Sequence, residues 1–160
     1  ELSLNEIAKI RKNTTVGLEV FIHGGMCSSF SGRCMLSNHM VNRDANRGGC
    51  AHSCRWNYDI YDSSNNKLNK DAYFNIGSKD LIALKEIAKL IEIGVDSLKI
   101  EGRMKSEYYI ATVVKTYRML IDKYYEIFNE KNKNKREDLL NSLDYELYLN
   151  EIKKAENNKE

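Results

Sequence analysis

The sequence lacks the features of several common protein classes. No apolar run reaches the length of about 18 residues that indicates a membrane-spanning helix, and no basic start with an apolar signal segment is present. We therefore expect a cytoplasmic protein without a membrane span. The chain has no proline, no HExxH motif and no Ser-His-Asp grouping, and the last two absences argue against familiar hydrolases. A net charge of +2 gives no general sign of nucleic-acid binding.

Cysteine is absent from most of the chain, because all four cysteines lie between residues 27 and 54. A buried free cysteine behaves as a small hydrophobe, so a core would scatter such residues. The crowding of Cys27, Cys34, Cys50 and Cys54 instead indicates a bound metal or cluster. A reducing compartment disfavours a pair of disulfides. Only Cys50 and Cys54 have the close spacing usual for structural zinc, so spacing leaves zinc and an iron-sulfur cluster as equal alternatives.

Three parts of the sequence resemble a known family. Residues 19–37 carry Glu, Phe, Gly, Cys, Gly, Cys and Ser at the offsets of the signature of the collagenase-like peptidase family of class U, family 32. The one departure is Gly25, where that family usually carries Ser or Ala. Residues 46–56 and 97–106 resemble the branch that contains the tRNA hydroxylation proteins. The resemblance extends over roughly residues 1–128.

This resemblance implies a fold, a cofactor and a function. Relatives are built on a TIM-like barrel, and several hold a four-iron, four-sulfur (4Fe-4S) cluster on cysteines that match those of this chain, which favours the cluster over zinc. The branch implies prephenate-dependent 5-hydroxylation of the wobble uridine, with the tRNA anticodon region as partner. Two alternatives remain: a collagenase-like peptidase, as the family name implies, and a non-catalytic cluster-binding fragment.

The fold class expected is α/β, in the form of a partial TIM-like (β/α) barrel. A complete barrel takes about 250 residues, and this chain has 160. We expect residues 1–130 to be the C-terminal part of a barrel, including a long Cys-rich loop over residues 23–58, without the N-terminal part. Residues 131–160 carry seven basic and seven acidic side chains and are expected to form a charged helical or flexible tail or linker, exposed to solvent.

Periodicity and capping residues place the expected elements. Ser3 and Glu6 form a capping box, Ser78 and Ser106 are N-cap candidates, and Gly94 is a helix stop. The expected helices cover residues 4–12, 79–93 and 107–129, and the expected strands cover residues 16–22, 56–61 and 95–100. This alternation is typical of parallel βα units, and the apolar stripes of the helices indicate core packing.

Polar residues follow two of the expected strands, at the end where barrel enzymes place their active sites. His23 ends the first strand, and Glu101, Arg103 and Lys105 follow Ile100. We expect His23, Glu101 and Arg103 to be catalytic, with Arg103 binding a carboxylate of a small dicarboxylate such as prephenate and Glu101 handling a proton. Lys99 or Lys105 would supply the second cation. The alternatives are a buried Lys99–Glu101 ion pair and a structural His23.

The expected loop is basic, since residues 23–58 contain four arginines and one acid. Arg47 and Arg55 are candidates for binding RNA phosphates, because a guanidinium matches two phosphate oxygens at once. Trp56 and Tyr58 are candidates for base stacking. The alternatives are arginines that merely solvate the loop and a Trp56 that anchors it by packing.

Overall fold

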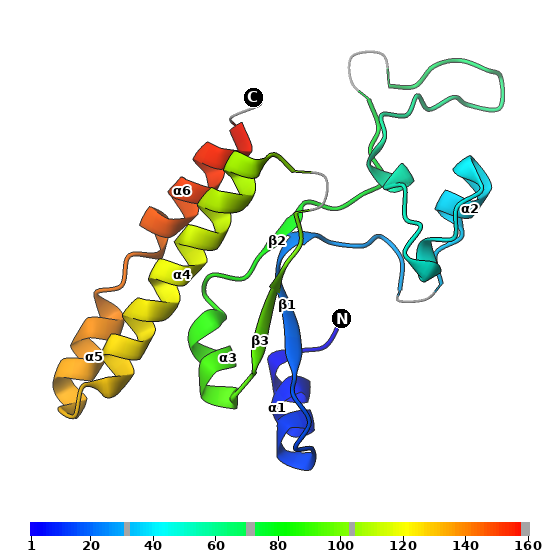
Figure 1. Cartoon of the computed structure of the whole chain (residues 1–160). Helices are drawn as coiled ribbons and strands as arrows, with labels where there is room; N and C mark the ends of the chain where they lie inside the picture. The colour runs from blue at the N-terminus through cyan, green and yellow to red at the C-terminus, as the bar shows by residue number, and fades with distance from the viewer. Residues whose placement is uncertain (31–32, 70–72, 103–104, 158–160) are drawn as a thin grey trace. The chain divides into compact units, whose positions relative to one another are not determined.

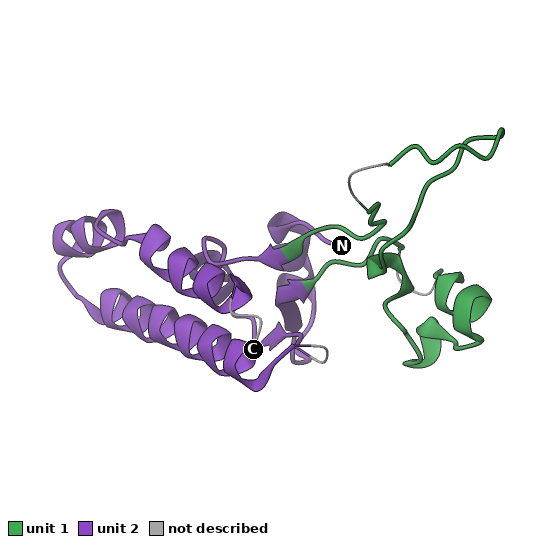
Figure 2. Cartoon of the chain, turned by 90° about the horizontal axis from the view of Figure 1, so that it is seen from above, with its two compact units in different colours: residues 1, 25–80 green, residues 2–24, 81–160 purple. Residues whose placement is uncertain are grey.

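The structure is a computed structural model that describes residues 1–30, 33–69, 73–102 and 105–157. The chain divides into two compact units (Figure 2). Unit 1 consists of Glu1 and Gly25–Asp80, and unit 2 consists of Leu2–Gly24 and Leu81–Glu160. Arg103, one of the predicted catalytic residues, lies outside the described residues.

A small sheet forms the centre of unit 2. Its strand order is β2-β1-β3, where β1 is Glu19–Gly25, β2 is Asp80–Ile82 and β3 is Ser97–Ile100. Strands β1 and β3 are parallel, as the alternation of elements predicted. Their register shifts between Phe21 and His23, and both Ile22 and His23 are buried. The simple alternation that would place Glu19, Phe21 and His23 on one side is therefore interrupted before His23.

Two predicted helix starts are confirmed. Helix α1 (Leu4–Asn13) begins at the capping box, in which Ser3 Oγ accepts from the Glu6 amide and the Glu6 carboxylate accepts from the Ser3 amide. Helix α4 (Glu107–Asn129) begins after Ser106, whose Oγ accepts from the Tyr109 amide at 3.2 Å. Each cap satisfies backbone donors that no helical carbonyl can reach, which fixes the start of the helix locally.

Helix α4 supplies the largest share of the buried core of unit 2. Its buried apolar residues other than Ile127, with those of β1 and α3 (Ile87–Ile93), form one cluster with Ile152 and Ala155 of α6 (Tyr145–Asn157). Helices α4 and α6 lie side by side (Figure 1). Burying a large apolar side chain contributes roughly 1.5–3 kcal/mol, so the buried stripe of α4 makes a large contribution to the stability of the unit. Its members on α4 are Tyr109, Val113, Tyr117, Leu120, Tyr124 and Ile127.

The predicted helix over residues 79–93 is wrong in its first half. Asp80–Ile82 form β2, and the Ala83 amide donates to the Ile22 carbonyl of β1 at 3.0 Å. The helix itself begins only at Ile87. The run of apolar residues from Leu81 to Leu84 suits a buried strand as well as a helix. It forms a strand because β1 offers backbone groups along one edge with which it can pair. The helix does end at Gly94, which has φ 82°.

The C-terminal segment is helical, which confirms one of its two expected forms. It contains α5 (Lys133–Asn141) and α6. The expectation of a solvent-exposed tail is wrong for α6, because Ile152 and Ala155 are 0% and 2% exposed. The charged residues of this segment lie between apolar positions that recur at helical spacing, and that stripe packs on α4.

Unit 1 contains more local structure than the expected loop. It includes helix α2 (Leu36–Val41) and the two 3₁₀ turns η1 (Ala45–Arg47) and η2 (Ser53–Arg55). The expected strand over residues 56–61 is reduced to two isolated antiparallel bridges, Tyr58 with Phe74 and Tyr61 with Lys67. Polar side chains in this segment form hydrogen bonds with backbone groups that a continuous strand would pair with another strand. Asn69 Oδ1 accepts from the Ile60 amide, and Asn69 Nδ2 donates to the Tyr58 carbonyl.

The described strands form a three-stranded sheet with helices, so a mixed α/β fold is confirmed. The TIM-like barrel remains a prediction. Within the described ranges, no helix has both the length and the apolar character needed to cross a membrane.

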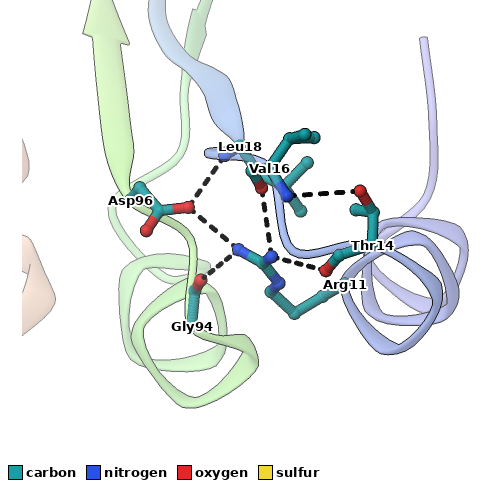
Figure 3. Close-up of polar contacts among 6 residues, drawn as sticks. All are labelled: Arg11, Thr14, Val16, Leu18, Gly94 and Asp96. Carbon is teal, nitrogen blue, oxygen red and sulfur yellow. Dashed lines mark hydrogen bonds and ion pairs between the residues drawn. The ribbon is translucent and has the colours of Figure 1, made fainter.

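The amino ends of the strands are held by Arg11 (Figure 3). Its guanidinium forms an ion pair with Asp96 at 2.9 Å and donates to the carbonyls of Thr14 and Val16 at 2.6 and 3.0 Å. Asp96 also accepts from the Leu18 amide at 2.8 Å. These bonds join the end of α1, the start of β1 and the turn before β3.

Candidate functional site

The carboxyl ends of β1 and β3 lie directly beside each other. The Glu101 amide donates to the His23 carbonyl at 2.9 Å. Gly24 has φ 125°, and a Cβ at this position would lie 2.7 Å from the Glu101 carbonyl oxygen. Only glycine tolerates both this backbone conformation and this approach. Ligands of α/β sheets generally bind at this edge, and a site here remains a prediction from the sequence.

The His23 side chain is fully buried between two tyrosines of α4. Its Nε2 lies 2.7 Å from Tyr109 Oη, and its Nδ1 lies 3.4 Å from Tyr117 Oη. Tyr117 Oη donates to the Ile22 carbonyl at 3.1 Å. These contacts connect the backbone of β1, the His23 ring and two turns of α4 into one buried polar chain.

The direction of these bonds follows from the number of protons available. A tyrosine hydroxyl has one proton, and that of Tyr117 is donated to the Ile22 carbonyl. The Tyr117 oxygen can therefore accept from His23 Nδ1–H, and His23 Nε2 lies within hydrogen-bonding distance of the Tyr109 hydroxyl.

Burial sets the electrostatics of this cluster. It raises the pKa of Tyr117 well above the usual value of 10, because the phenolate would lose its hydration. Lys105, at the same edge, places Nζ 4.7 Å from the centre of the Tyr109 ring, a cation–π distance. Among the residues that the structure describes, the site therefore combines buried hydroxyls with the Lys105 cation at its margin.

The predicted residues at this edge have different positions. His23 is buried, Glu101 and Lys105 are partly buried, and the position of Arg103 lies outside the described residues. Lys99 is exposed on β3, so the alternative of a buried Lys99–Glu101 ion pair is wrong. The structure thus brings His23, Glu101 and Lys105 to one edge of the sheet.

Sequence reasoning missed the two tyrosines as polar partners. Neither Tyr109 nor Tyr117 was singled out from the sequence. A usable signal existed, because a tyrosine on the buried face of a helix needs a hydrogen-bond partner for its hydroxyl. Both tyrosines lie on the buried face of α4, and the one histidine that ends a strand was the natural partner.

In unit 1, the predicted RNA-binding residues differ in accessibility. Arg47 is exposed in η1, whereas the guanidinium of Arg55 lies 3.0 Å from the Asp80 carboxylate. Trp56 is 40% exposed, but the Tyr58 hydroxyl donates to the Ser53 carbonyl at 2.6 Å. Arg47 and Trp56 remain available to a ligand, and Tyr58 has a structural bond.

The four cysteines of unit 1 are free thiols, with Cys27 exposed and the other three partly buried. Amide groups donate to two of the sulfurs, Ser29 N to Cys27 Sγ and His52 N to Cys50 Sγ, each at 3.4 Å. Their chemistry suits a thiolate-bound metal or cluster. Among the residues that the structure describes, however, no three Cys, His, Asp or Glu side chains are grouped as a metal site requires.

Comparison with known proteins finds a matching family model and several similar proteins. The model of Peptidase family U32 matches residues 1–158. The chain is 51% identical over 129 residues to "tRNA hydroxylation protein P1" of Bacillus subtilis and 35% identical over 122 residues to "23S rRNA 5-hydroxycytidine C2501 synthase" of Escherichia coli. It is 39% identical over 113 residues to "Collagenase" of Porphyromonas gingivalis.

These matches extend over 78%, 76% and 71% of the chain and over 31%, 18% and 31% of the three relatives. The chain therefore spans about a third or less of the length of these relatives. No solved structure matches it.

Proposed function

Because this chain belongs to peptidase family U32, we propose that it forms part of an enzyme that hydroxylates carbon 5 of a pyrimidine base in RNA. The proposed substrate is the wobble uridine of tRNA, in the anticodon region. The similarity to a tRNA hydroxylation protein over most of the chain carries this proposal. A second relative is named for 5-hydroxycytidine formation in rRNA, which is the same change on the other pyrimidine.

The proposed site for a small co-substrate is the carboxyl edge of β1 and β3. Prephenate carries two carboxylates, so its site needs cations at the margin and proton-handling groups within reach. Lys105 supplies one cation beside the Tyr109–His23 pair, and Glu101 follows the same strand. Arg103 is proposed as the second cation from its place in the sequence. The sheet itself is proposed to be one part of a TIM-like barrel, in which such an edge forms the active site.

A 4Fe-4S cluster on Cys27, Cys34, Cys50 and Cys54 is also part of the proposal, with zinc as the alternative. The donor set supports it chemically, because four free thiols lie close together in the sequence and two sulfurs accept amide hydrogen bonds. The arrangement of the described side chains does not bring three ligands together, so we assign the cluster no step of the reaction. Iron and sulfide analysis of protein purified without oxygen tests this part separately.

The test of the function is restoration of the modified base in cells. A strain that lacks the gene is supplied with the full-length protein, and 5-hydroxylated uridine at the wobble position is measured by mass spectrometry of tRNA. We expect the wild type to restore the modification and Glu101→Gln to restore little of it. Arg118→Ala removes an exposed ion pair on α4 and is the control for expression. An unchanged level of the modification in the deletion strain would refute the proposal.

A second candidate function is proteolysis, which the similarity to a collagenase favours. The chemistry of the site argues against it. The imidazole nitrogens of His23 contact two phenol hydroxyls of tyrosine, which are poor nucleophiles when their pKa is raised by burial, as for Tyr117. Incubation of the purified protein with gelatin distinguishes the two functions, since only a peptidase would release peptides.

A further inference from the structure

Arg55 connects distant parts of unit 1. Its Nη2 lies 3.0 Å from Asp80 Oδ1, and the two side chains are 25% and 10% exposed. The contact is charge pairing, without the alignment of a hydrogen bond. Asp80 is the least exposed acid in the ion pairs found among the described residues. A partly buried pair of this kind affects local structure more than an exposed one, because removing one partner leaves the other charge poorly solvated.

Two glycines make room for the Arg55 side chain. A Cβ on Gly25 would lie 2.1 Å from Nη2 and 2.6 Å from Cζ, so the guanidinium occupies the space that any other residue would fill. A Cβ on Gly77 would lie 3.2 Å from Arg55 Cγ.

Hydrogen bonds join the same three stretches of chain. The Gly77 amide donates to the Cys54 carbonyl at 2.7 Å, and Asn75 Nδ2 donates to the Arg55 carbonyl at 3.0 Å. Ser78 Oγ donates to the Met26 carbonyl at 3.4 Å. The first residues of unit 1, its middle at Cys54–Arg55 and its last residues therefore meet around one guanidinium.

From these contacts we infer that Arg55 is a positioning residue that closes unit 1, and that it is not a ligand for RNA phosphate. Its pair with Asp80 joins the middle of the 25–80 segment to its last residue, beside Gly25, and holds the backbone beside Cys54. Gly25 is the residue that permits this closure. The inference deepens the proposed function. Only the part that concerns RNA phosphate rests on that function, and the positioning role of Arg55 does not.

The first test is a double-mutant cycle that requires no RNA. The full-length protein is digested with chymotrypsin under native conditions, and cleavage within residues 25–80 is timed for Arg55→Ala, Asp80→Ala and the double variant. We expect about a tenfold faster cleavage for each single variant, and no further increase for the double variant, because both remove one closure. Arg43→Ala, which changes an exposed arginine of the same unit, should leave the rate unchanged. If the Arg55→Ala variant were cleaved at the same rate as the wild type, the inference would be overturned.

Gly25→Ala provides an independent route to the same closure. The added methyl group displaces the guanidinium, which is the flexible end of its side chain, so the ion pair is lost while the backbone stays in place. We expect the same increase in cleavage as for Arg55→Ala, and little further effect of Gly25→Ala in the Arg55→Ala background. Independent, multiplying effects of the two substitutions would contradict the role of Gly25.

Binding of a tRNA transcript at several salt concentrations separates positioning from phosphate contact. A lost phosphate contact lowers the slope of log K against log salt by about 0.7 to 0.9. We expect Arg55→Ala and Asp80→Ala to weaken binding to a similar extent with the slope unchanged. A reduced slope for Arg55→Ala, together with normal or tighter binding by Asp80→Ala, would identify Arg55 as a phosphate ligand. If the wild type binds no tRNA, the proposed function fails, and the cleavage cycle still decides the role of Arg55.

Discussion

The two ends of the sheet in unit 2 use polar side chains in opposite ways. At the amino ends, Arg11 is bound by backbone carbonyls and by the largely exposed Asp96, so the bonds connect elements near water. At the carboxyl ends, the His23 imidazole and the hydroxyls of Tyr109 and Tyr117 are enclosed in the core. Burying polar groups opposes folding unless every one is satisfied, so the hydrogen bonds of this cluster decide whether it stabilises or destabilises the unit.

Glycine substitutions should give the largest contrast between the two ends. Gly24→Ala at the carboxyl end combines a strained φ of 125° with a contact to the Glu101 backbone, and should lower the free energy of unfolding by about 3 kcal/mol or more. Gly94→Ala at the amino end introduces only the strain of φ 82°, since the atom nearest to the added Cβ would be Arg11 Cδ at 3.9 Å. We expect it to lower the free energy of unfolding by about 1 kcal/mol. Urea unfolding measures both, and equal losses would remove the contrast.

His23 offers the next largest effect. His23→Leu keeps an apolar shape but leaves the Tyr109 and Tyr117 hydroxyls without the ring nitrogens, which should cost about 2–3 kcal/mol in urea unfolding. The triple variant with Tyr109→Phe and Tyr117→Phe should recover most of this loss, because the Ile22 carbonyl still accepts from Ala83.

The same triple variant sharpens the comparison functionally. If the buried cluster serves chemistry, the variant should be stable and yet fail to restore RNA hydroxylation in the deletion strain. A stable variant that restores the modification fully would show that both ends of the sheet are structural.

The alkaline stability of the core is a smaller effect with a defined sign. Burial raises the pKa of Tyr117 and of Tyr124 in the folded state, so both states are protonated below about pH 10 and this contribution is fully present there. Above that pH the unfolded chain ionises first, and stability falls by about 1.4 kcal/mol per pH unit for each tyrosine. Tyr117→Phe should make the loss between pH 10 and 12 shallower by that amount. If the slope of the unfolding free energy against pH were unchanged, Tyr117 would have the same pKa in the folded and unfolded states.

The smallest effect is expected at the amino end. Arg11→Ala removes the ion pair to Asp96 and the bonds to the Thr14 and Val16 carbonyls, and should lower the free energy of unfolding by about 1 kcal/mol, since the site is partly solvated. Asp96→Asn should cost less and should lose its effect at high salt, because it removes only the charge. A loss from Arg11→Ala larger than that from His23→Leu would reverse the comparison.

The sequence predicted the elements whose signals are local. The capping box at Ser3 and the cap at Ser106 are read from a few neighbouring residues, and both helices begin where expected. Strand β2 was missed because Leu81–Leu84 have no distinguishing period, and their conformation depends on pairing with β1. The burial of Ile152 on α4 likewise depends on a contact between segments distant in sequence.

The candidate site stays a prediction, and the structure shows where its described members lie. The rule that parallel strands place ligands at their carboxyl ends pointed to His23 and Glu101 from the sequence, and the structure places both at that edge. The partners of His23 are 86 and 94 residues away in the chain, so only the packing of α4 on β1 reveals them. Arg55 was assigned from its charge, whereas the pairing with Asp80 depends on how residues 25–80 fold back.

The position of α6 limits how this region can be shortened for biochemical work. Truncation after residue 130 would uncover the side of α4 that α6 packs against and would remove Tyr145, whose hydroxyl contacts that of Tyr124. Helix α4 would then expose an apolar face to water, which promotes self-association. A shortened protein intended for crystallisation or spectroscopy should therefore retain every residue up to Asn157.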